Sequence, residues 1–240
     1  MVIAYHVIYS MYGFWLPNDP RESWSDFVGS WELFRYGPAT KVEDYRSYAH
    51  DPHDRTRRLE AKSALKYPPV VLTGAQALSV ATGFADVARR SGYHIYACAV
   101  LPDHGHLVIG RHHYKVEQVV RRLKQAAGRQ LDLDELHPFA GLTARRGALP
   151  TPFAENCWHC FIDNDKYARA AIRYTENNPL KEGKPRQRWS FVEPVAAGRV
   201  VIESLAHHDA VPAQRQRSRR RFPALSQLRD RECSTRTVFE

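Results

Sequence analysis

Two histidines separated by one residue are the first feature of this sequence that could do chemistry. His104 and His106 lie in a run of strand-forming residues, and side chains two apart in a strand project from the same face. Two imidazoles on one face can chelate a single metal ion. Asp103 adjoins the pair, where its carboxylate could orient a ring nitrogen. Because the chain has 12 histidines, such a pair also arises by chance, and it needs a second motif to support it.

A tyrosine and an asparagine one helical turn apart provide that second motif. Tyr174 and Asn178 share one stripe of a helical pattern with Tyr167 and precede Pro179. An amide oxygen can serve as a third metal ligand, and a phenol can serve as a nucleophile. The simpler interpretation is that Tyr174 packs at the rim of the core and Asn178 closes the helix. Between the two tyrosines we favour Tyr174, because Asn178 lies beside it.

The elements that must position these residues follow from hydrophobic periodicity and from turn residues. The expected elements, in chain order, are a strand over 2–15, a helix over 73–92, strands over 93–100 and 104–110, a helix over 116–131, a strand over 157–162, and a helix that Asp163 or Asp165 caps and that ends before Pro179. This order predicts an α+β fold, the ferredoxin-like split βαβ arrangement: an antiparallel sheet with two helices on one face. An additional C-terminal helix follows the sheet.

Two segments fall outside this plan. Residues 17–69 form an insertion that is polar and rich in proline, with room for one or two short helices. From about residue 203 the chain becomes a basic tail, typical of disorder, so the predicted domain spans 1–200 and the tail spans 203–240.

The composition excludes several classes of protein. Of the 240 residues, 43% are hydrophobic and 25% are charged, which excludes global disorder. No apolar run approaches the roughly 20 residues of a spanning helix, and the N-terminus lacks the pattern of a signal peptide, so we expect a cytoplasmic protein with no membrane partner. In that compartment the four cysteines should be thiols. The formal net charge of +9 favours a polyanionic partner such as nucleic acid.

Basic and aromatic side chains mark where such a partner would bind. The candidate DNA contacts are Arg121, Arg122, Lys124 and Arg129 on the outer face of helix 116–131, together with Arg173. The insertion interleaves arginines with aromatic residues, a composition typical of a groove in which bases stack: Trp24, Trp31, Phe34, Tyr36, Tyr45 and Tyr48. Ordinary solvation of the helix and anchoring of the insertion would produce the same patterns.

A Cys-x-x-Cys pair, Cys157 and Cys160, is typical of half a zinc site. The other two cysteines, Cys98 and Cys233, do not form a second pair, and Cys157 and Cys160 fall in an expected strand. We therefore do not expect zinc.

With both chemical motifs in view, the chain resembles the Y1 transposases of the IS200/IS605 type. Residues 101–109, Leu-Pro-Asp-His-Gly-His-Leu-Val-Ile, are similar to the family's Pro-Asp/Asn-His-hydrophobic-His-hydrophobic strand. Residues 173–183, Arg-Tyr-Thr-Glu-Asn-Asn-Pro-Leu-Lys-Glu-Gly, are similar to the Tyr-x-x-x-Asn-Pro-x-x-x-Gly helix end of REP-associated tyrosine transposases, the branch that the chain resembles most.

The resemblance implies an HUH endonuclease that cleaves and rejoins single-stranded hairpin DNA through a 5′-phosphotyrosine. It implies that Tyr174 is the nucleophile and that His104, His106 and Asn178 bind Mg²⁺ or Mn²⁺, with Asp103 supporting the histidines. The alternatives are a domesticated DNA- or RNA-binding protein with little catalysis, and a hydrolytic nuclease without a covalent intermediate. Both a monomer and a homodimer are compatible with the resemblance. Gly105 replaces the bulky hydrophobe of the family pattern, and we expect it to loosen the strand.

Overall fold

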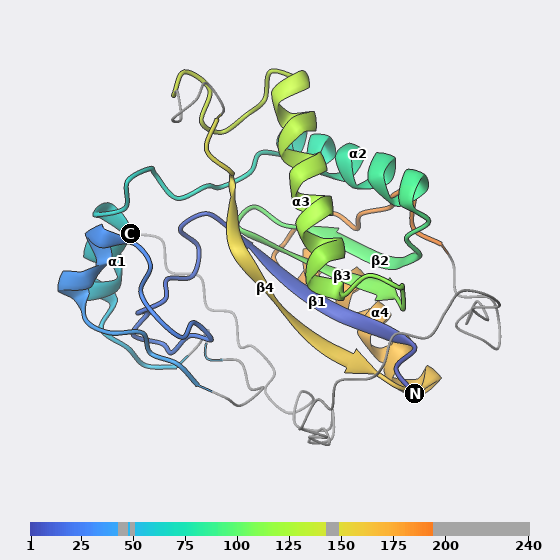
Figure 1. Ribbon diagram of the computed structural model, residues 1–240, viewed down its shortest axis with the longest axis horizontal. Helices are drawn as coiled ribbons and strands as arrows, with labels where there is room; N and C mark the ends of the chain where they lie inside the picture. Colours follow the sequence, from blue (N-terminus) through green and yellow to red (C-terminus); the bar gives the residue numbers. More distant parts are fainter. Residues whose placement is uncertain (43–47, 49–50, 143–148, 194–240) are drawn as a thin grey trace. The chain divides into compact units, whose positions relative to one another are not determined.

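The computed structural model describes residues 1–42, 48, 51–142 and 149–193, in which the expected order of elements is confirmed (Figure 1). The elements are β1 (Ala4–Met11), the 3₁₀ helix η1 (Trp31–Tyr36), α1 (Arg55–Ser63), α2 (Gly74–Ser91), β2 (Ile95–Val100), β3 (His104–Gly110), α3 (Val116–Leu133), β4 (Phe153–Ile162) and α4 (Asp165–Lys181). The two short helices of the insertion are η1 and α1. The predicted tail lies outside the described residues. Among these helices none is long and apolar enough to cross a membrane.

The four strands form one antiparallel sheet in the order β2-β3-β1-β4. β1 therefore lies in the interior between β3 and β4. It is shorter than predicted and ends at Met11, because the pairing with β4 shifts register after Tyr9 and Gly13 takes a positive φ of 77°. β4 begins four residues earlier than predicted, because Phe153 pairs with Met11 of β1 ahead of the register shift, after which the pairing continues from Cys157, opposite Tyr9.

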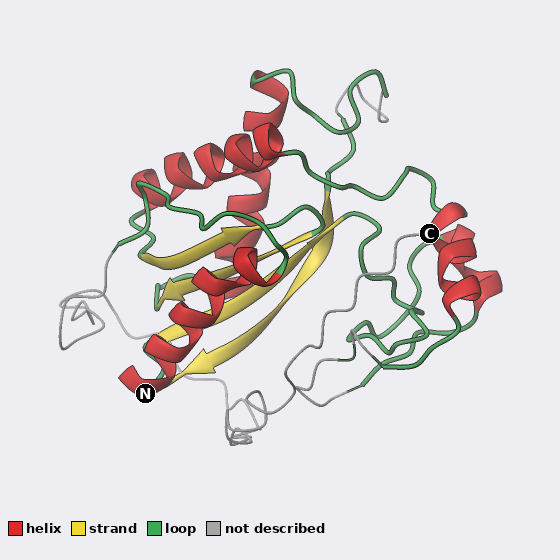
Figure 2. Ribbon diagram, turned by 180° about the vertical axis from the view of Figure 1, so that it is seen from behind, coloured by secondary structure: helices red, strands yellow, loops and turns green. Residues whose placement is uncertain are grey.

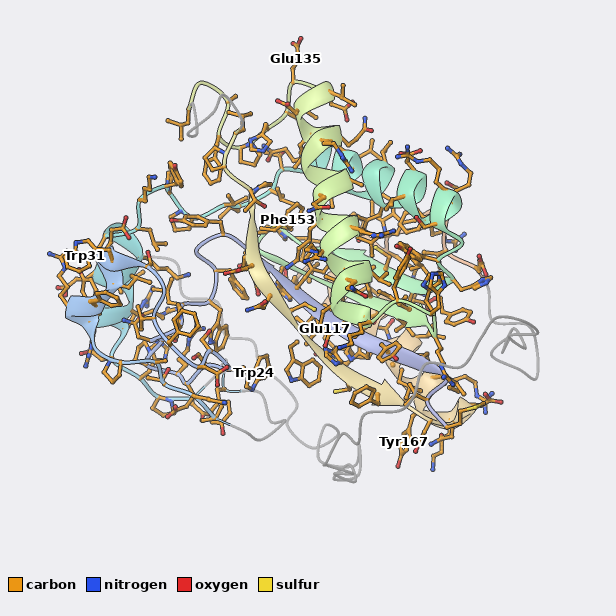
Figure 3. The ribbon with its side chains drawn as sticks, in the orientation of Figure 1. Trp24, Trp31, Glu117, Glu135, Phe153 and Tyr167 are labelled. Carbon is orange, nitrogen blue, oxygen red and sulfur yellow. The ribbon has the colours of Figure 1, made fainter. Side chains whose placement is uncertain are left out.

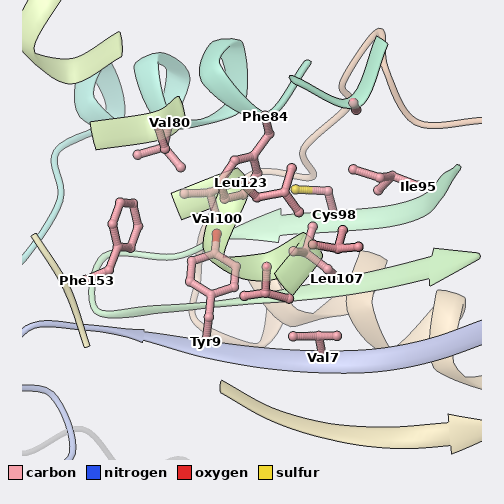
Figure 4. Packing of buried hydrophobic residues seen from close by; sticks show 14 of the residues in the cluster. Val7, Tyr9, Val80, Phe84, Ile95, Cys98, Val100, Leu107, Leu123 and Phe153 are labelled. Carbon is pink, nitrogen blue, oxygen red and sulfur yellow. The ribbon is translucent and has the colours of Figure 1, made fainter. Parts of the chain in front are cut away.

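The helices α2 and α3 pack together over one face of the sheet. Thr73, where the predicted helix begins, is the N-cap of α2 and forms a full capping box with Gln76. Gly83 lets the two helices approach closely, since a Cβ there would lie 2.7 Å from the Cα of Ala127. Side chains from both helices and from the sheet form the main core, in which Tyr9, Phe84 and Phe153 meet (Figure 4).

The opposite face of the sheet carries α4 (Figure 2). The apolar side chains of α4 face the sheet: Ala168 is fully buried in a smaller core with Val108 and Ile162, and Ala171 packs against this core. α4 lies along β2 and β3, so the side chains of β1 on this face are only partly covered.

Both predicted ends of α4 were wrong. The N-cap is Asn164, whose side chain accepts a hydrogen bond from the backbone N–H of Tyr167. The helix also continues through Pro179 to Lys181. A proline forfeits one backbone hydrogen bond, and so close to the helix end little helix remains to be disrupted. The chain then leaves the helix through a bond from the N–H of Lys184 to the carbonyl of Pro179.

Candidate active site

The pairing of the central strands places the histidine pair on the face that carries α4. In the register of β1 and β3, His104 lies opposite Ser10 and His106 lies opposite Ile8. Directly opposed residues of an antiparallel pair share a face. The same alternation adds a third imidazole, His6, whose ring stacks against His106 with 5.6 Å between centroids. Thus the predicted common face of His104 and His106 is confirmed.

Gly105 does not loosen the strand, contrary to expectation. β3 runs unbroken from His104 to Gly110 and pairs with strands on both sides. A Cβ at position 105 would lie 2.3 Å from the phenol ring atoms of Tyr9, the residue opposite on β1. The glycine therefore leaves room for a buried cross-strand tyrosine, which fills the layer that a bulky residue would otherwise fill.

His104 is held on both sides of its ring. Its Nδ1 donates to Oδ1 of Asp103 at 2.7 Å, which confirms the predicted contact and leaves the lone pair of Nε2 available to a metal ion. The ring of Phe14 stacks on it with 5.2 Å between centroids and 8° between planes. On the other side, Oε1 of Glu182 lies 3.9 Å from Nε2.

His106 is buried, with 3% of its surface exposed. Its Nδ1 lies 3.4 Å from Nε2 of His6. Burial lowers the pKa of His106 well below its usual value, and His6, His104 and Lys181 lower it further. Burial also lowers the pKa of His6 to about 4. Both rings are therefore neutral at pH 7, which is the protonation state in which imidazole binds metals.

Tyr174 lies beside these imidazoles, as the two motifs together predict. Its ring centroid is 5.5 Å from that of His106 and 5.6 Å from that of His6, both in edge-to-face geometry. Lys181 carries its ammonium group 4.3 Å from the centre of the Tyr174 ring. Tyr167, the weaker candidate, instead packs against the smaller core near the start of α4. α4 thus contributes one tyrosine to the histidine site.

Asn178 is buried, and its amide nitrogen donates to the backbone carbonyl of Tyr174 at 3.3 Å. Just after α4, Glu182 brings its Oε1 within 3.9 Å of Nε2 of His104. Within the described ranges, no three His, Cys, Asp or Glu side chains are grouped as a metal site.

The donor set still fits a divalent ion. The imidazoles of His104 and His106 share a face, Nε2 of His104 adjoins a carboxylate, and Asn178 can offer an amide oxygen of the kind that Mg²⁺ and Mn²⁺ accept.

The predicted DNA contacts divide into two groups. Arg121, Arg122, Arg129 and Arg173 are exposed. Lys124 is not on the outer face of α3, contrary to the prediction: it is buried, and its ammonium group donates to the carbonyls of Ala154 and Asn156 in β4 at 2.8 and 2.7 Å. Burial lowers the pKa of Lys124 to about 8. Lys124 therefore joins α3 to β4, although in the sequence it looks like one more exposed cation of a basic helix.

The side chains of Cys157 and Cys160 do not lie on the same face of the sheet, so they cannot bind one zinc ion together. They are three residues apart in β4, so they lie on opposite faces of the sheet, opposite Tyr9 and His6 respectively.

Sequence reasoning missed four residues of the site: His6, Phe14, Lys62 and Glu182. The strand alternation of β1 offered a signal for His6, but the register with β3 was needed to use it. Phe14 precedes the insertion and Lys62 lies within it, in α1, and the Lys62 ammonium lies 5.7 Å from the Phe14 ring centre. No pattern in the sequence connects them to His104.

Comparison with known proteins supports the resemblance drawn from the sequence. Residues 63–137 match the model of the family described as Transposase IS200 like. This segment contains α2, β2, β3 and α3, and with them the histidine pair, whereas Tyr174 lies beyond it. No curated protein matches the chain.

Two solved structures resemble the chain at low sequence identity. One is the structure of the REP-associated tyrosine transposase bound to a REP hairpin, with 14% identity, 87% of this chain and 93% of that chain covered, and a TM-score of 0.41. The other is the crystal structure of a candidate transposase from Deinococcus radiodurans R1, with 16% identity, 78% and 94% covered, and a TM-score of 0.33. The resemblance to the IS200-like transposases is thus confirmed by the family match across the segment that holds His104 and His106.

Proposed function

We propose that this protein is a transposase-type endonuclease that cleaves and rejoins single-stranded hairpin DNA through a 5′-phosphotyrosine intermediate. The observation that carries the proposal is the meeting of Tyr174 with His106, whose ring centroids are 5.5 Å apart although the residues come from separate motifs. The IS200-like match over the histidine strand supports the same chemistry. Tyr174 and His106 meet within one chain, so the proposed site needs no second copy.

The proposed metal ligands are His104, His106 and Asn178, with Mg²⁺ or Mn²⁺ as the ion. Such an ion, when bound, neutralises charge on a non-bridging phosphate oxygen during in-line attack. The protein's own part is to hold the ligands in place. Asp103 fixes the ring of His104, and His6 stacks on the ring of His106.

The proposed step exchanges one phosphodiester for another. The Tyr174 oxygen bonds to phosphorus as the bond from phosphorus to the 3′ oxygen breaks. The phenol gives up a proton and the leaving oxygen takes one up, which yields a free 3′-hydroxyl and a 5′-phosphotyrosine. Because the two esters have similar energies, an incoming 3′-hydroxyl can reverse the step elsewhere and release Tyr174 without ATP.

Cations around the site suit a phosphodiester substrate. Lys181 lies against the Tyr174 ring, and Arg173 is exposed next to it in the chain. Lys62 lies 5.7 Å from the ring centre of Phe14, which stacks on His104. Burial lowers the pKa of Lys62, and repulsion from Arg58 and Arg21 lowers it further, against the attraction of Asp19 and Asp103. An anionic strand entering the site would relieve this repulsion.

Strand cleavage by variants tests the proposal. Purified protein is incubated with end-labelled single-stranded hairpin DNA from its own genomic flanks and Mn²⁺, and the products are separated on a denaturing gel. Tyr174→Phe should abolish cleavage, and Tyr167→Phe, a matched change on the same helix, should leave it intact. If Tyr174→Phe still nicks the strand, the enzyme is a hydrolytic nuclease. If the wild type binds the DNA but never cleaves it, the DNA- or RNA-binding alternative holds.

A further inference from the structure

Two tryptophans extend the row of rings that begins at the histidine pair. Trp158 of β4 lies opposite Ile8, on the site face, and its ring stands edge-on to His6 at 6.1 Å. Trp24, from the insertion, stacks on Trp158 with 5.3 Å between centroids and 23° between planes. Aromatic rings therefore run without a break from Tyr174 through His106, His6 and Trp158 to Trp24.

The chain around Trp24 is held firmly. Ser23, next to it, exchanges backbone hydrogen bonds with Thr40 and Val42, and its hydroxyl donates to the carbonyl of Pro17 at 2.6 Å. Just upstream, the guanidinium of Arg21 makes two hydrogen bonds of 2.8 Å to the fully buried Asp19. Because this stretch of backbone is fixed, the Trp24 ring loses little conformational freedom when a ligand stacks on it.

Trp24 keeps 44% of its surface exposed in spite of the stacking. The neighbouring sheet face is partly exposed, because α4 packs on β2 and β3 and leaves His6, Ile8 and Ser10 incompletely buried. Anchoring of the insertion explains the contact between the two tryptophans. It does not explain why a large apolar ring stays exposed beside a site that faces solvent.

We propose that Trp24 and Trp158 form a stacking site for an unpaired base of single-stranded DNA next to the phosphate that Tyr174 attacks. The inference rests on the proposed function, and it names how that site holds its strand. Every nucleobase has a π-face that can stack on an indole ring, so this contact does not depend on the sequence of the strand. A duplex, whose bases already stack on each other, would not bind there. The net charge of +9 and the cations beside Tyr174 suit the phosphates of the same strand.

The insertion offers a matched control. Trp31 is even more exposed, at 81%, but its ring meets Phe34 and lies away from β4, whereas Trp24 lies toward it (Figure 3). The full-length protein and its Trp24→Ala, Trp24→Phe and Trp31→Ala variants are titrated with a fluorescent single-stranded oligonucleotide from the genomic flank, and with the same sequence as a duplex. Trp24→Ala should weaken single-strand binding about tenfold. Trp24→Phe should restore most of the loss, and Trp31→Ala should bind as the wild type does.

An abasic oligonucleotide localises the contact. Single abasic nucleotides are placed in turn along the strand, and the wild type should lose about tenfold in affinity at one position near the cleavage point. Trp24→Ala should lose nothing further at that position, because the ring that stacks on the base is already absent.

The outcomes separate this inference from the proposed function. If Trp24→Ala binds as tightly as Trp31→Ala while wild-type protein cleaves the strand, the stacking site is wrong and the endonuclease stands. If Trp24→Ala weakens binding but no protein cleaves, the stacking site stands and the endonuclease is wrong. If the wild type does not prefer the single strand to the duplex, the stacking site is overturned whatever the cleavage result.

Discussion

The phenol ring of Tyr9 occupies the space that a side chain at position 105 would need. The two residues face each other across β1 and β3, and a Cβ on Gly105 would approach the Tyr9 ring to 2.3 Å. Tyr9 is 1% exposed and packs edge-on against Phe84 and Phe153. The histidine strand therefore keeps its shape through a tyrosine that comes from another strand.

Gly105→Ala should destabilise the protein by about 1–3 kcal/mol, since the added methyl group must displace a ring in a packed core. Urea unfolding followed by circular dichroism measures the change. In a Tyr9→Leu background the same substitution should cost clearly less, because the two positions share one space.

A helical glycine provides the control. Gly128, in α3, has room for a Cβ, whose nearest neighbour would be Pro152 at 4.0 Å. Gly128→Ala should therefore stabilise the protein by about 0.5–1 kcal/mol. Equal effects of the alanines at positions 105 and 128 would refute the role given to Tyr9.

Lys124 and Arg121 should separate stability from DNA binding. Lys124→Met removes the donor to two carbonyls of β4 and should cost about 1–3 kcal/mol of unfolding free energy. Arg121→Met, at an exposed position of the same helix, should leave stability nearly unchanged. If Arg121 contacts a phosphate, its loss should reduce the salt dependence of DNA binding by about one unit of slope. If the Lys124→Met variant were as stable as the wild type but bound DNA more weakly, Lys124 would be a DNA contact after all.

The sequence predicted the individual strands and helices of this fold better than the contacts between them. Strand alternation around His104 and the apolar stripe of α4 each follow from local periodicity, so the histidine strand and the tyrosine helix could be placed in advance. Their meeting could not, because the register between β1 and β3 depends on long-range pairing. The burial of Lys124 was missed for a related reason: a lysine on a basic stripe gives no sign that it reaches the carbonyls of another element.

The two β4 cysteines should be slow to react in the folded protein. Burial raises the pKa of Cys157 to about 11 and that of Cys160 to about 12, from a usual 9.0, so little thiolate is present at pH 8. A Cys233→Ser background removes the tail thiol. In it, iodoacetamide should label Cys157 and Cys160 at least tenfold more slowly in the folded than in the unfolded protein at pH 8.

The same pKa values set the direction of a stability change at high pH. Above about pH 9 the unfolded chain loses thiol protons that the folded chain retains, so unfolding becomes easier as pH rises toward 11. Replacing both cysteines with alanine should reduce this loss in urea unfolding between pH 8 and 10.5. Rapid labelling of both thiols in the folded protein at pH 8 would contradict their burial.

Asp103 should matter for metal binding through His104. Its carboxylate accepts the Nδ1 proton and fixes the ring, and loss of such a partner usually weakens metal affinity about 10–100-fold. Titration calorimetry with Mn²⁺ should show this loss in Asp103→Ala. Asp132→Ala, which removes an exposed carboxylate from α3, should bind Mn²⁺ as the wild type does. Equal affinities for all three proteins would mean that Asp103 does not support metal binding by His104.

Mapping a covalent adduct tests the central claim most directly. The protein is incubated with single-stranded hairpin DNA from its flanks and Mn²⁺, digested with trypsin and nuclease, and the nucleotide-bearing peptide is sequenced by mass spectrometry. The account predicts a phosphodiester on Tyr174 that disappears in His104→Ala. A cleaved strand whose adduct lies on Tyr167 or any other residue, or cleavage with no adduct at all, would contradict it.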